Sequence, residues 1–300
     1  MTTESGAYRG RFAPSPTGRL HFGSLLAAVG SWLHARRRGG TWLVRIEDID
    51  PPREVAGASV AILDALAAFG MTSDEPVWFQ HDRHDAYASA LQHLIDADHV
   101  FPCACTRATV RERGGHRGRC AAPDDTSPVA WRMAAPDREI GFVDALQGPY
   151  RQNLRDDVGD FVLRRADGLW AYQLAVVVDD AAQGITDVVR GADLLDSTPR
   201  QMLLHEALGV PTPAYAHLPL LLDEQGHKLA KQTGATPLDT DDPMPALRHA
   251  LAVLGMDDAA RRPAPTPQRL LDMAIDDFDL ARIPRQLSLR SATWLARAVG

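Results

Sequence analysis

Hydrophobic positions near the start of the chain switch from a strand pattern to a helix pattern and back. The segment from Tyr8 to Ala13 has the composition of a short strand, and apolar residues from Leu25 to Leu33 then recur at helical spacing. Gly39-Gly40 ends this helix, and the run TWLVRI at 41–46 is rich in β-forming residues. The pattern therefore predicts a βαβ unit with two parallel strands and a right-handed crossover.

The turn between the first strand and the helix has the features of a phosphate site. Pro14 and Pro16 bar strand pairing there, while Gly18 and Gly23 leave room for a ligand beside the main chain. His21 stands just before the helix, whose first N–H groups and dipole favour an anion. The alternative interpretation is that His21 only caps the helix or packs at the turn.

The second predicted strand is followed by a carboxylate and a helix-start signal. Glu47 comes directly after the strand, and Asp50 with Pro51 is typical of an N-cap, which predicts a helix that runs to Phe69 and stops at Gly70. Ligands of parallel sheets bind beyond the carboxyl ends of the strands. We therefore expect Glu47 and the proline turn to share one crevice.

The remainder of the chain alternates less regularly between strands and helices. Residues 73–146 contain a helical stretch, 85–97, and all three cysteines, and they interrupt the alternation. The further predicted elements are a hairpin at 160–178 with its turn at Asp167-Gly168, a strand at 185–190, a helix at 197–208, a strand at 217–223, and helices from Pro243 onward. These elements predict an α/β protein with an insertion in its sheet.

Composition and charge narrow the class of protein. The formal net charge of the 300 residues is −7, so a nucleic-acid partner would have to be met by a local basic face, for which 36–38 and 107–119 are the candidates. No apolar run is long enough to cross a bilayer, and the first residues lack the pattern of a signal peptide. We expect a cytoplasmic protein with no membrane partner.

The choice of basic residues is uneven. Of the 32 lysine and arginine residues only two are lysines, Lys228 and Lys231, three positions apart. A site that needs a compact ammonium, which a planar guanidinium cannot replace, explains this better than chance clustering.

The cysteines form a candidate metal site. Cys103 and Cys105 are two apart, so both thiols face one side of an extended segment, and His116 and Cys120 are four apart, as on one helical turn. Three thiolates and an imidazole suit one closed, structural Zn²⁺ ion. The alternative is a set of reduced, buried thiols with His116 in solvent.

Four stretches together resemble the class I aminoacyl-tRNA synthetases of the glutamyl type. They are RFAPSPTGRLHFGSL at 11–25, LVRIEDIDPPRE at 43–54, VVVDDAAQGITDVVRGADLL at 176–195 and KLAKQ at 228–232. The first resembles the nucleotide signature of that family, with His-Phe-Gly-Ser in place of His-Ile-Gly-His, and the last resembles its lysine signature. The resemblance implies activation of L-glutamate by ATP with Mg²⁺.

The resemblance also assigns roles to residues of this chain. It implies catalytic roles for His21, Lys228 and Lys231, and ATP contacts for His21, Gly23 and Lys231. It implies that L-glutamate is bound by Arg11, Phe12, Ala13, Pro14, Ser15, Glu47, Tyr172 and Arg190. Two cations and one anion would match the two carboxylates and the ammonium of glutamate.

Only about seventy residues follow the lysine signature, too few for a large helical anticodon-binding domain. This feature, the HFGSL variant and the Cys-x-Cys insertion resemble the paralogous glutamyl-Q tRNA(Asp) synthetases. That family attaches glutamate, activated without tRNA, to the queuosine base at the wobble position of tRNA(Asp). There are three alternatives: a shortened glutamyl-tRNA synthetase charging the 3′ end of tRNA(Glu), a ligase or nucleotidyltransferase acting on a small amine without RNA, and a catalytically silent RNA-binding paralogue. The last would be expected to have damaged signatures, whereas His21, Gly23, Glu47, Lys228 and Lys231 are all present.

We therefore expect an α/β fold: a Rossmann-type parallel-sheet catalytic domain with a zinc-bearing insertion and a small C-terminal helical region, present as a monomer. The predicted division is 1–73 for the first half of the catalytic domain, 74–146 for the insertion, 147–226 for the second half, and 227–300 for the lysine-signature loop and the C-terminal helices.

Overall fold

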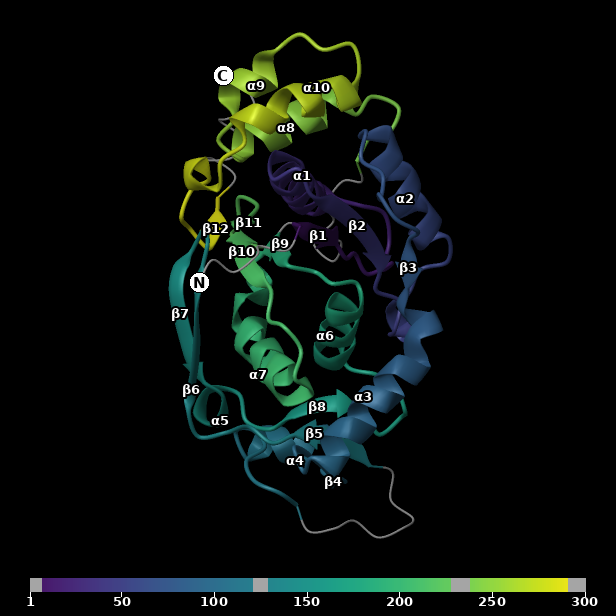
Figure 1. Cartoon of the computed structure of the whole chain (residues 1–300), viewed down its shortest axis with the longest axis vertical. Coiled ribbons are helices and arrows are strands. Elements are labelled where there is room, and N and C mark those ends of the chain that lie inside the picture. Colours follow the sequence, from purple (N-terminus) through teal and green to yellow (C-terminus); the bar gives the residue numbers. More distant parts are fainter. Residues whose placement is uncertain (1–6, 121–128, 228–237, 291–300) are drawn as a thin grey trace.

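A five-stranded parallel sheet forms the centre of the molecule. The computed structural model describes residues 7–120, 129–227 and 238–290. The strands of the sheet lie in the order β10-β9-β1-β2-β3, and every neighbouring pair is parallel (Figure 1). Their bounds are Arg9–Phe12 for β1, Thr41–Ile46 for β2, Trp78–Phe79 for β3, Asp187–Gly191 for β9 and Ala214–Leu218 for β10.

The predicted βαβ unit is confirmed. Strand β1 pairs in parallel with β2, with Arg9 opposite Thr41, and helix α1, Phe22–Arg37, connects the two strands. The helix ends where predicted, because Gly39 adopts a φ of 60° that suits glycine, and the chain then turns into β2.

Helices cover both faces of the sheet (Figure 1). On one side α1 packs beneath three C-terminal helices, with which it shares an apolar core that includes Leu33, Leu251 and Leu270. On the other side, a second core joins Leu91, Leu174 and Leu204. The helices are α2 Ala58–Ala68, α3 His84–Asp96, α6 Tyr172–Ala182, α7 Thr198–Leu208, α8 Met244–Val253, α9 Asp257–Arg261 and α10 Pro267–Ala274. None of the helices in the described ranges has the length and apolar character needed to cross a membrane.

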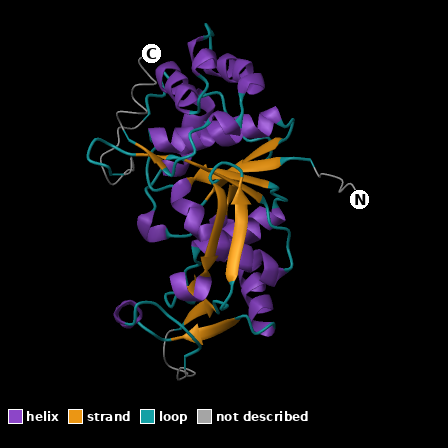
Figure 2. Ribbon diagram, turned by 90° about the vertical axis from the view of Figure 1, so that its left-hand side faces the viewer, coloured by secondary structure: helices purple, strands orange, loops and turns teal. Residues whose placement is uncertain are grey.

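A smaller antiparallel sheet, in the order β4-β5-β8, lies at the end of the molecule opposite α8–α10 (Figure 1). The hairpin of β6 and β7 runs lengthwise between the two sheets (Figure 2). The bounds are β4 Val100–Cys103, α4 Arg107–Glu112, β5 Ala130–Met133, β6 Glu139–Asp144, β7 Gly148–Asn153, α5 Leu154–Asp157 and β8 Phe161–Arg164. Near the C-terminal helices, β11 Leu220–Leu221 pairs in parallel with β12 Ser288–Leu289.

The predicted helix from Asp50 to Phe69 is divided. Pro51–Arg53 forms a 3₁₀ turn, and α2 begins only at Ala58, after Gly57 has adopted a left-handed φ of 77°. The Asp50 side chain makes no capping hydrogen bond, because its carboxylate pairs with Arg53 instead. Asp50 is thus the N-cap residue of this short turn, with Pro51 following it as predicted, but an ion pair with Arg53 takes the place of a side-chain cap.

The predicted hairpin at 160–178 is wrong in its second half. The turn is present, since the N–H of Gly168 donates to the carbonyl oxygen of Arg165 at 2.9 Å. From Tyr172 onward, however, the chain is the helix α6, in which Leu174 and Val177 are buried in the second core. Packing of the helix outweighs the β-propensity of its valines.

The predicted strand 217–223 is also divided. It separates at Pro219 into the end of β10 and the short β11, because proline has no N–H to donate to a neighbouring strand. The predicted domain division stays a proposal. Within it, β3 from the predicted insertion pairs with β2, and the β6–β7 hairpin spans the predicted boundary at 146.

Candidate active site and metal cluster

A cavity of about 250 Å³ lies at the carboxyl edge of the central sheet. Strands β2 and β9 flank β1 on opposite sides, so the loops that follow β1 and β9 leave a crevice between them. The cavity is lined by Arg11, Phe12, Ala13, His21, Gly23, Ser24, Leu26, Ala27, Glu47, Tyr172, Val189, Arg190, Gly191, Asp193, Leu194, Leu218, Pro219, Leu220 and Leu221. Eight of the residues that the sequence selects therefore meet in one place, although the ligand that each contacts remains a prediction.

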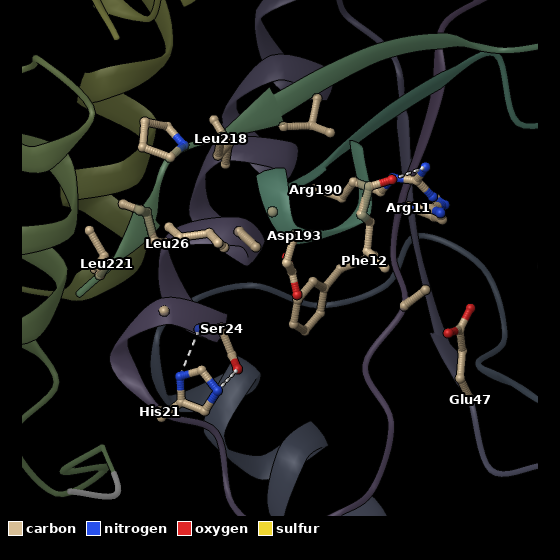
Figure 3. A pocket seen from close by; sticks show the side chains of 18 of the residues that line it. Arg11, Phe12, His21, Ser24, Leu26, Glu47, Arg190, Asp193, Leu218 and Leu221 are labelled. Atoms are coloured by element: carbon tan, nitrogen blue, oxygen red, sulfur yellow. Dashed lines mark hydrogen bonds between the residues drawn. The ribbon is translucent and has the colours of Figure 1, made fainter. Parts of the chain in front are cut away.

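One side of the cavity carries two cations and one anion (Figure 3). Arg11 from β1, Arg190 from β9 and Glu47 after β2 are all buried. The Nη1 group of Arg190 donates a hydrogen bond to the hydroxyl of Tyr172 at 3.3 Å. Burial raises the pKa of Glu47 to about 7, although Arg45 and Arg11 act in the opposite direction. A cationic ligand beside Glu47 would favour its ionised form.

A buried charged pair supports this side of the cavity from below. Arg45 is fully buried in β2, and its Nη2 group donates to Oδ1 of Asp180 at 2.6 Å. Nε of Arg11 donates to the same oxygen at 3.1 Å. Sequence reasoning selected neither Arg45 nor Asp180. The sequence feature that could have pointed to Arg45 is its position as a charged residue inside the otherwise apolar TWLVRI strand.

The opposite side of the cavity is the start of α1 (Figure 3). His21 is the N-cap of the helix: its Nδ1 accepts from the N–H of Ser24 at 3.3 Å, and its Nε2 lies 3.1 Å from the Ser24 hydroxyl. The ring therefore caps the helix and also lines the cavity with Gly23. Asp193 also lines the cavity, and sequence reasoning missed it, although it lies in the quoted GADLL run.

A second hollow of about 720 Å³ adjoins the first and shares Glu47, Tyr172 and His21 with it. Pro14 and Ser15 line this second hollow and not the first. The carbonyl of Pro14 accepts from the N–H of Glu47 at 3.0 Å, so the proline turn and the carboxylate share one crevice as predicted. Lys228 and Lys231 lie outside the described residues.

The four predicted metal ligands lie together. Their ligand atoms are all within 4.8 Å of one another. Sγ of Cys120 is 3.5 Å from Sγ of Cys105 and 3.6 Å from Sγ of Cys103, while Nε2 of His116 is 3.0 Å from Sγ of Cys120. A tetrahedral zinc with Zn–S bonds of about 2.3 Å needs ligand separations only slightly larger than these. The cluster can therefore hold one metal ion.

The surroundings of His116 fit a metal ligand. Its Nδ1 lies 2.9 Å from Oδ2 of Asp160, an arrangement that leaves Nε2 facing the sulfurs and fixes the ring orientation. Burial, together with hydrogen bonds to Cys105 and Cys103, raises the pKa of Cys120 to about 12, so a cation is needed to hold all three sulfurs as thiolates.

The prediction that His116 and Cys120 share a helical turn is wrong. Helix α4 ends at Glu112, and the chain from His116 to Cys120 is a loop in which Gly118 has a φ of 86°. Two arginines of the basic stretch around this loop are engaged within the chain. The guanidinium of Arg117 donates to backbone carbonyls, and that of Arg119 pairs with Asp98 at 2.7 Å.

The parallel sheet, its crevice and the helix capped by His21 belong to a class I aminoacyl-tRNA synthetase catalytic domain, as two comparisons show. The family model for tRNA synthetases class I (E and Q), catalytic domain, matches residues 7–128 and 121–273. A glutamate tRNA ligase from Elizabethkingia meningosepticum, crystallised with its amino acid, superposes with a TM-score of 0.81 at 28% identity. The match covers 97% of this chain and 68% of that one.

Closer relatives define the group within this class. The Glutamyl-Q tRNA(Asp) synthetase of Xanthomonas campestris pv. campestris strain 8004 is 56% identical over 286 residues, which is 95% of this chain and 96% of the relative. That of Burkholderia cenocepacia strain J2315 is 55% identical over 283 residues, 90% of this chain and 95% of the relative. The chain therefore belongs to the glutamyl-Q tRNA(Asp) synthetase family of class I ligases.

Proposed function

We propose that the protein activates L-glutamate with ATP in the absence of tRNA and transfers the glutamyl group to the queuosine base at the wobble position of tRNA(Asp). In the first step an oxygen of the α-carboxylate of glutamate attacks the α-phosphorus, the bond to the β-phosphate breaks, and pyrophosphate leaves. In the second step a queuosine hydroxyl attacks the acyl carbon of the adenylate, loses its proton, and AMP leaves.

The observation that carries the proposal is the charge pattern of the 250 Å³ cavity. L-glutamate presents two carboxylates and one ammonium group. Arg11 and Arg190 offer two buried guanidinium groups for the carboxylates, and Glu47 offers a buried carboxylate for the ammonium. Phe12, Ala13 and Tyr172 also line the cavity, and the Tyr172 hydroxyl accepts a hydrogen bond from Arg190. Charge-assisted contacts of this kind discriminate against glutamine, which lacks the second negative charge.

The start of α1 is the proposed place for the phosphates of ATP. A helix N-terminus favours an anion, and both His21 and Gly23 line the cavity there. In the proposal Lys231, with Lys228, supplies positive charge as pyrophosphate leaves, and Mg²⁺ accompanies ATP and neutralises phosphate charge. In-line phosphoryl chemistry of this kind depends mainly on positioning and electrostatic stabilisation.

The second hollow is the proposed entrance for the acceptor. It shares Glu47 and Tyr172 with the first cavity, so an acceptor that enters it can reach a glutamyl group held there. In the proposal Cys103, Cys105, His116 and Cys120 hold a structural Zn²⁺, which would stabilise the segment from Cys103 to Cys120. We further propose that the protein is a cytoplasmic monomer.

The deciding experiment measures transfer of labelled glutamate to total tRNA from cells that make queuosine and from cells that do not. We expect label only on the queuosine-containing tRNA. The product should also survive enzymatic removal of the 3′-terminal adenosine, because the ester sits in the anticodon. A product lost on trimming, and formed equally on both tRNA samples, would instead identify a glutamyl-tRNA synthetase.

The same assay distinguishes the proposed function from that of a ligase acting on a small amine. That activity would consume glutamyl-adenylate with an added amine and would label no RNA. Glutamate-dependent exchange of pyrophosphate into ATP, measured without tRNA, tests the activation step alone. An unaltered protein that gives no such exchange would contradict the proposed tRNA-independent activation.

A further inference from the structure

Hydrogen bonds within the protein fix the orientation of the Arg190 guanidinium. Nε donates to Nε2 of His217 at 3.0 Å, and Nη2 donates to the hydroxyl of Thr198 at 2.8 Å and the carbonyl of Leu194 at 3.2 Å. Nη1 donates one N–H to Tyr172. An arginine has five N–H donors, so these contacts within the described residues leave one N–H of Nη1 for a ligand in the cavity.

Whether His217 can accept the hydrogen bond from Nε of Arg190 depends on which of its ring nitrogens carries a proton. This side chain is fully buried at the end of β10, and its Nδ1 lies 2.5 Å from Oδ2 of Asp144, which is equally buried at the end of β6. Because Nε of Arg190 always carries a proton, Nε2 of His217 must be unprotonated to accept from it. The ring is therefore neutral, with its proton on Nδ1, from which it donates to the Asp144 carboxylate.

Asp144 is itself fixed in one orientation. Its Oδ1 accepts from the backbone N–H groups of Leu146, Gln147 and His217 at 3.0, 2.8 and 3.1 Å. Only Oδ2 is then directed at the imidazole. Burial lowers the pKa of His217, and the guanidinium of Arg190 lowers it further, against the effect of Asp144. A lowered pKa of His217 agrees with the neutral ring that the hydrogen bonds require.

We propose that Asp144 and His217 are positioning residues: the carboxylate holds the imidazole in the Nδ1-protonated tautomer, and the imidazole orients Arg190 toward the acidic amino acid. This proposal rests on the assignment of Arg190 to glutamate binding. The link runs from the β6–β7 hairpin, through β10, to the cavity between β1 and β9. Neither residue lines that cavity, so both act only through Arg190.

The isosteric change Asp144→Asn tests the tautomer directly. The amide oxygen must stay on the three backbone N–H groups, which turns the NH₂ group toward His217 and forces its Nδ1 to become the acceptor. Nε2 then carries the proton and opposes Nε of Arg190. In glutamate-dependent pyrophosphate exchange we expect KM for glutamate to rise about tenfold or more, while KM for ATP and kcat stay within about twofold.

Two substitutions of His217 separate orientation from packing. In His217→Gln the amide oxygen takes the place of Nε2 and still accepts from Arg190, whereas in His217→Asn the amide takes the place of Nδ1 and keeps only the contact with Asp144. We expect KM for glutamate to rise more in His217→Asn than in His217→Gln. Asp137→Asn, an exposed carboxylate just before β6, is the control and should leave both KM values unchanged.

Three results would overturn the proposal. They are wild-type KM for glutamate in folded Asp144→Asn, equal rises in the two His217 variants, and parallel rises in KM for glutamate and for ATP, which indicate a merely structural role. If Asp144→Asn does not fold, the His217 pair decides the question. A failure of the proposed function is distinguishable, because the unaltered protein would then show no glutamate-dependent exchange.

Discussion

Asp180 accepts a hydrogen bond from Arg45 at 2.6 Å, and the side chains of both residues are almost completely shielded from solvent. The pair joins α6 to β2 and contacts two charged residues of the cavity: Asp180 accepts from Arg11, and Arg45 lies 3.5 Å from Glu47. Burial by itself would raise the pKa of Asp180, but Arg11 and Arg45 outweigh it and lower that pKa to about 2. The pair is thus both a structural link and a support for Arg11.

Asp180→Ala should strongly destabilise the protein. The change leaves the guanidinium of Arg45 buried beside one fewer carboxylate, and loss of one partner of a buried ion pair costs about 3 to 5 kcal/mol. The free energy of unfolding in urea measures this. Glu75→Gln, which removes an exposed partner of Arg9, is the control and should change the stability far less. Equal losses in the two variants would contradict this prediction.

The same pair gives a pH dependence of stability. The pKa of Asp180 lies below its ordinary value of 3.8. Its contribution to the free energy of unfolding is therefore fully present above pH 3.8 and is lost as the pH falls toward about 2.

The contribution of Glu47 to the free energy of unfolding depends on pH in the opposite direction. Its pKa is raised from 4.5 to about 7, so its contribution is present below 4.5 and is lost as the pH rises through 7.

Glutamate binding should weaken in acid because of Glu47. Its ionised form is the proposed partner of the ligand ammonium, and its pKa is about 7. KM for glutamate should therefore rise about tenfold between pH 8 and pH 6, with KM for ATP as the internal control. Glu47→Gln should weaken binding at pH 8 and flatten this dependence. A variant that retains the full pH dependence would assign it to another group.

Removal of the metal should loosen the end of the molecule that contains β4 and β5. Elemental analysis of protein purified without chelator should find about one zinc per chain, and chelation should lower the melting temperature. Cys120→Ser should reproduce this loss, because one sulfur ligand is gone. Asp98→Asn, which changes an exposed carboxylate paired with Arg119, is the matched control. If protein purified without chelator contained no metal, and chelation left its melting temperature unchanged, the proposed structural zinc site would be wrong.

Lys231→Ala should abolish glutamate-dependent pyrophosphate exchange, since the proposed mobile charge on the leaving group is lost. Lys231→Arg tests why lysine is kept here in a chain whose other basic residues, apart from Lys228, are arginines. If a compact ammonium is required, the arginine variant should also lose most of its kcat while glutamate binding is retained. Normal exchange by Lys231→Ala would show that the nucleotide assignment is wrong.

The sequence alone determined the local architecture around the first strand. Alternating patterns, Gly39-Gly40 and the TWLVRI run predicted β1, α1 and β2 because each of these signals acts over only a few neighbouring residues. The spacing of three cysteines and His116 likewise selected the metal cluster. Of the eight predicted residues that line the cavity, most came from the resemblance of quoted motifs to a known family, since no local pattern reveals what a distant arginine will face.

Only the tertiary structure decided which charged groups meet in the interior. Arg45 and Asp180 are 135 residues apart, and Asp144 and His217 are 73 apart, so no local pattern brings either pair together. The same holds for α6, whose valines favour a strand until burial between packed helices makes them helical. Pairing of buried charges and burial of helix faces are properties of the closed fold, and they exist only once distant segments have packed.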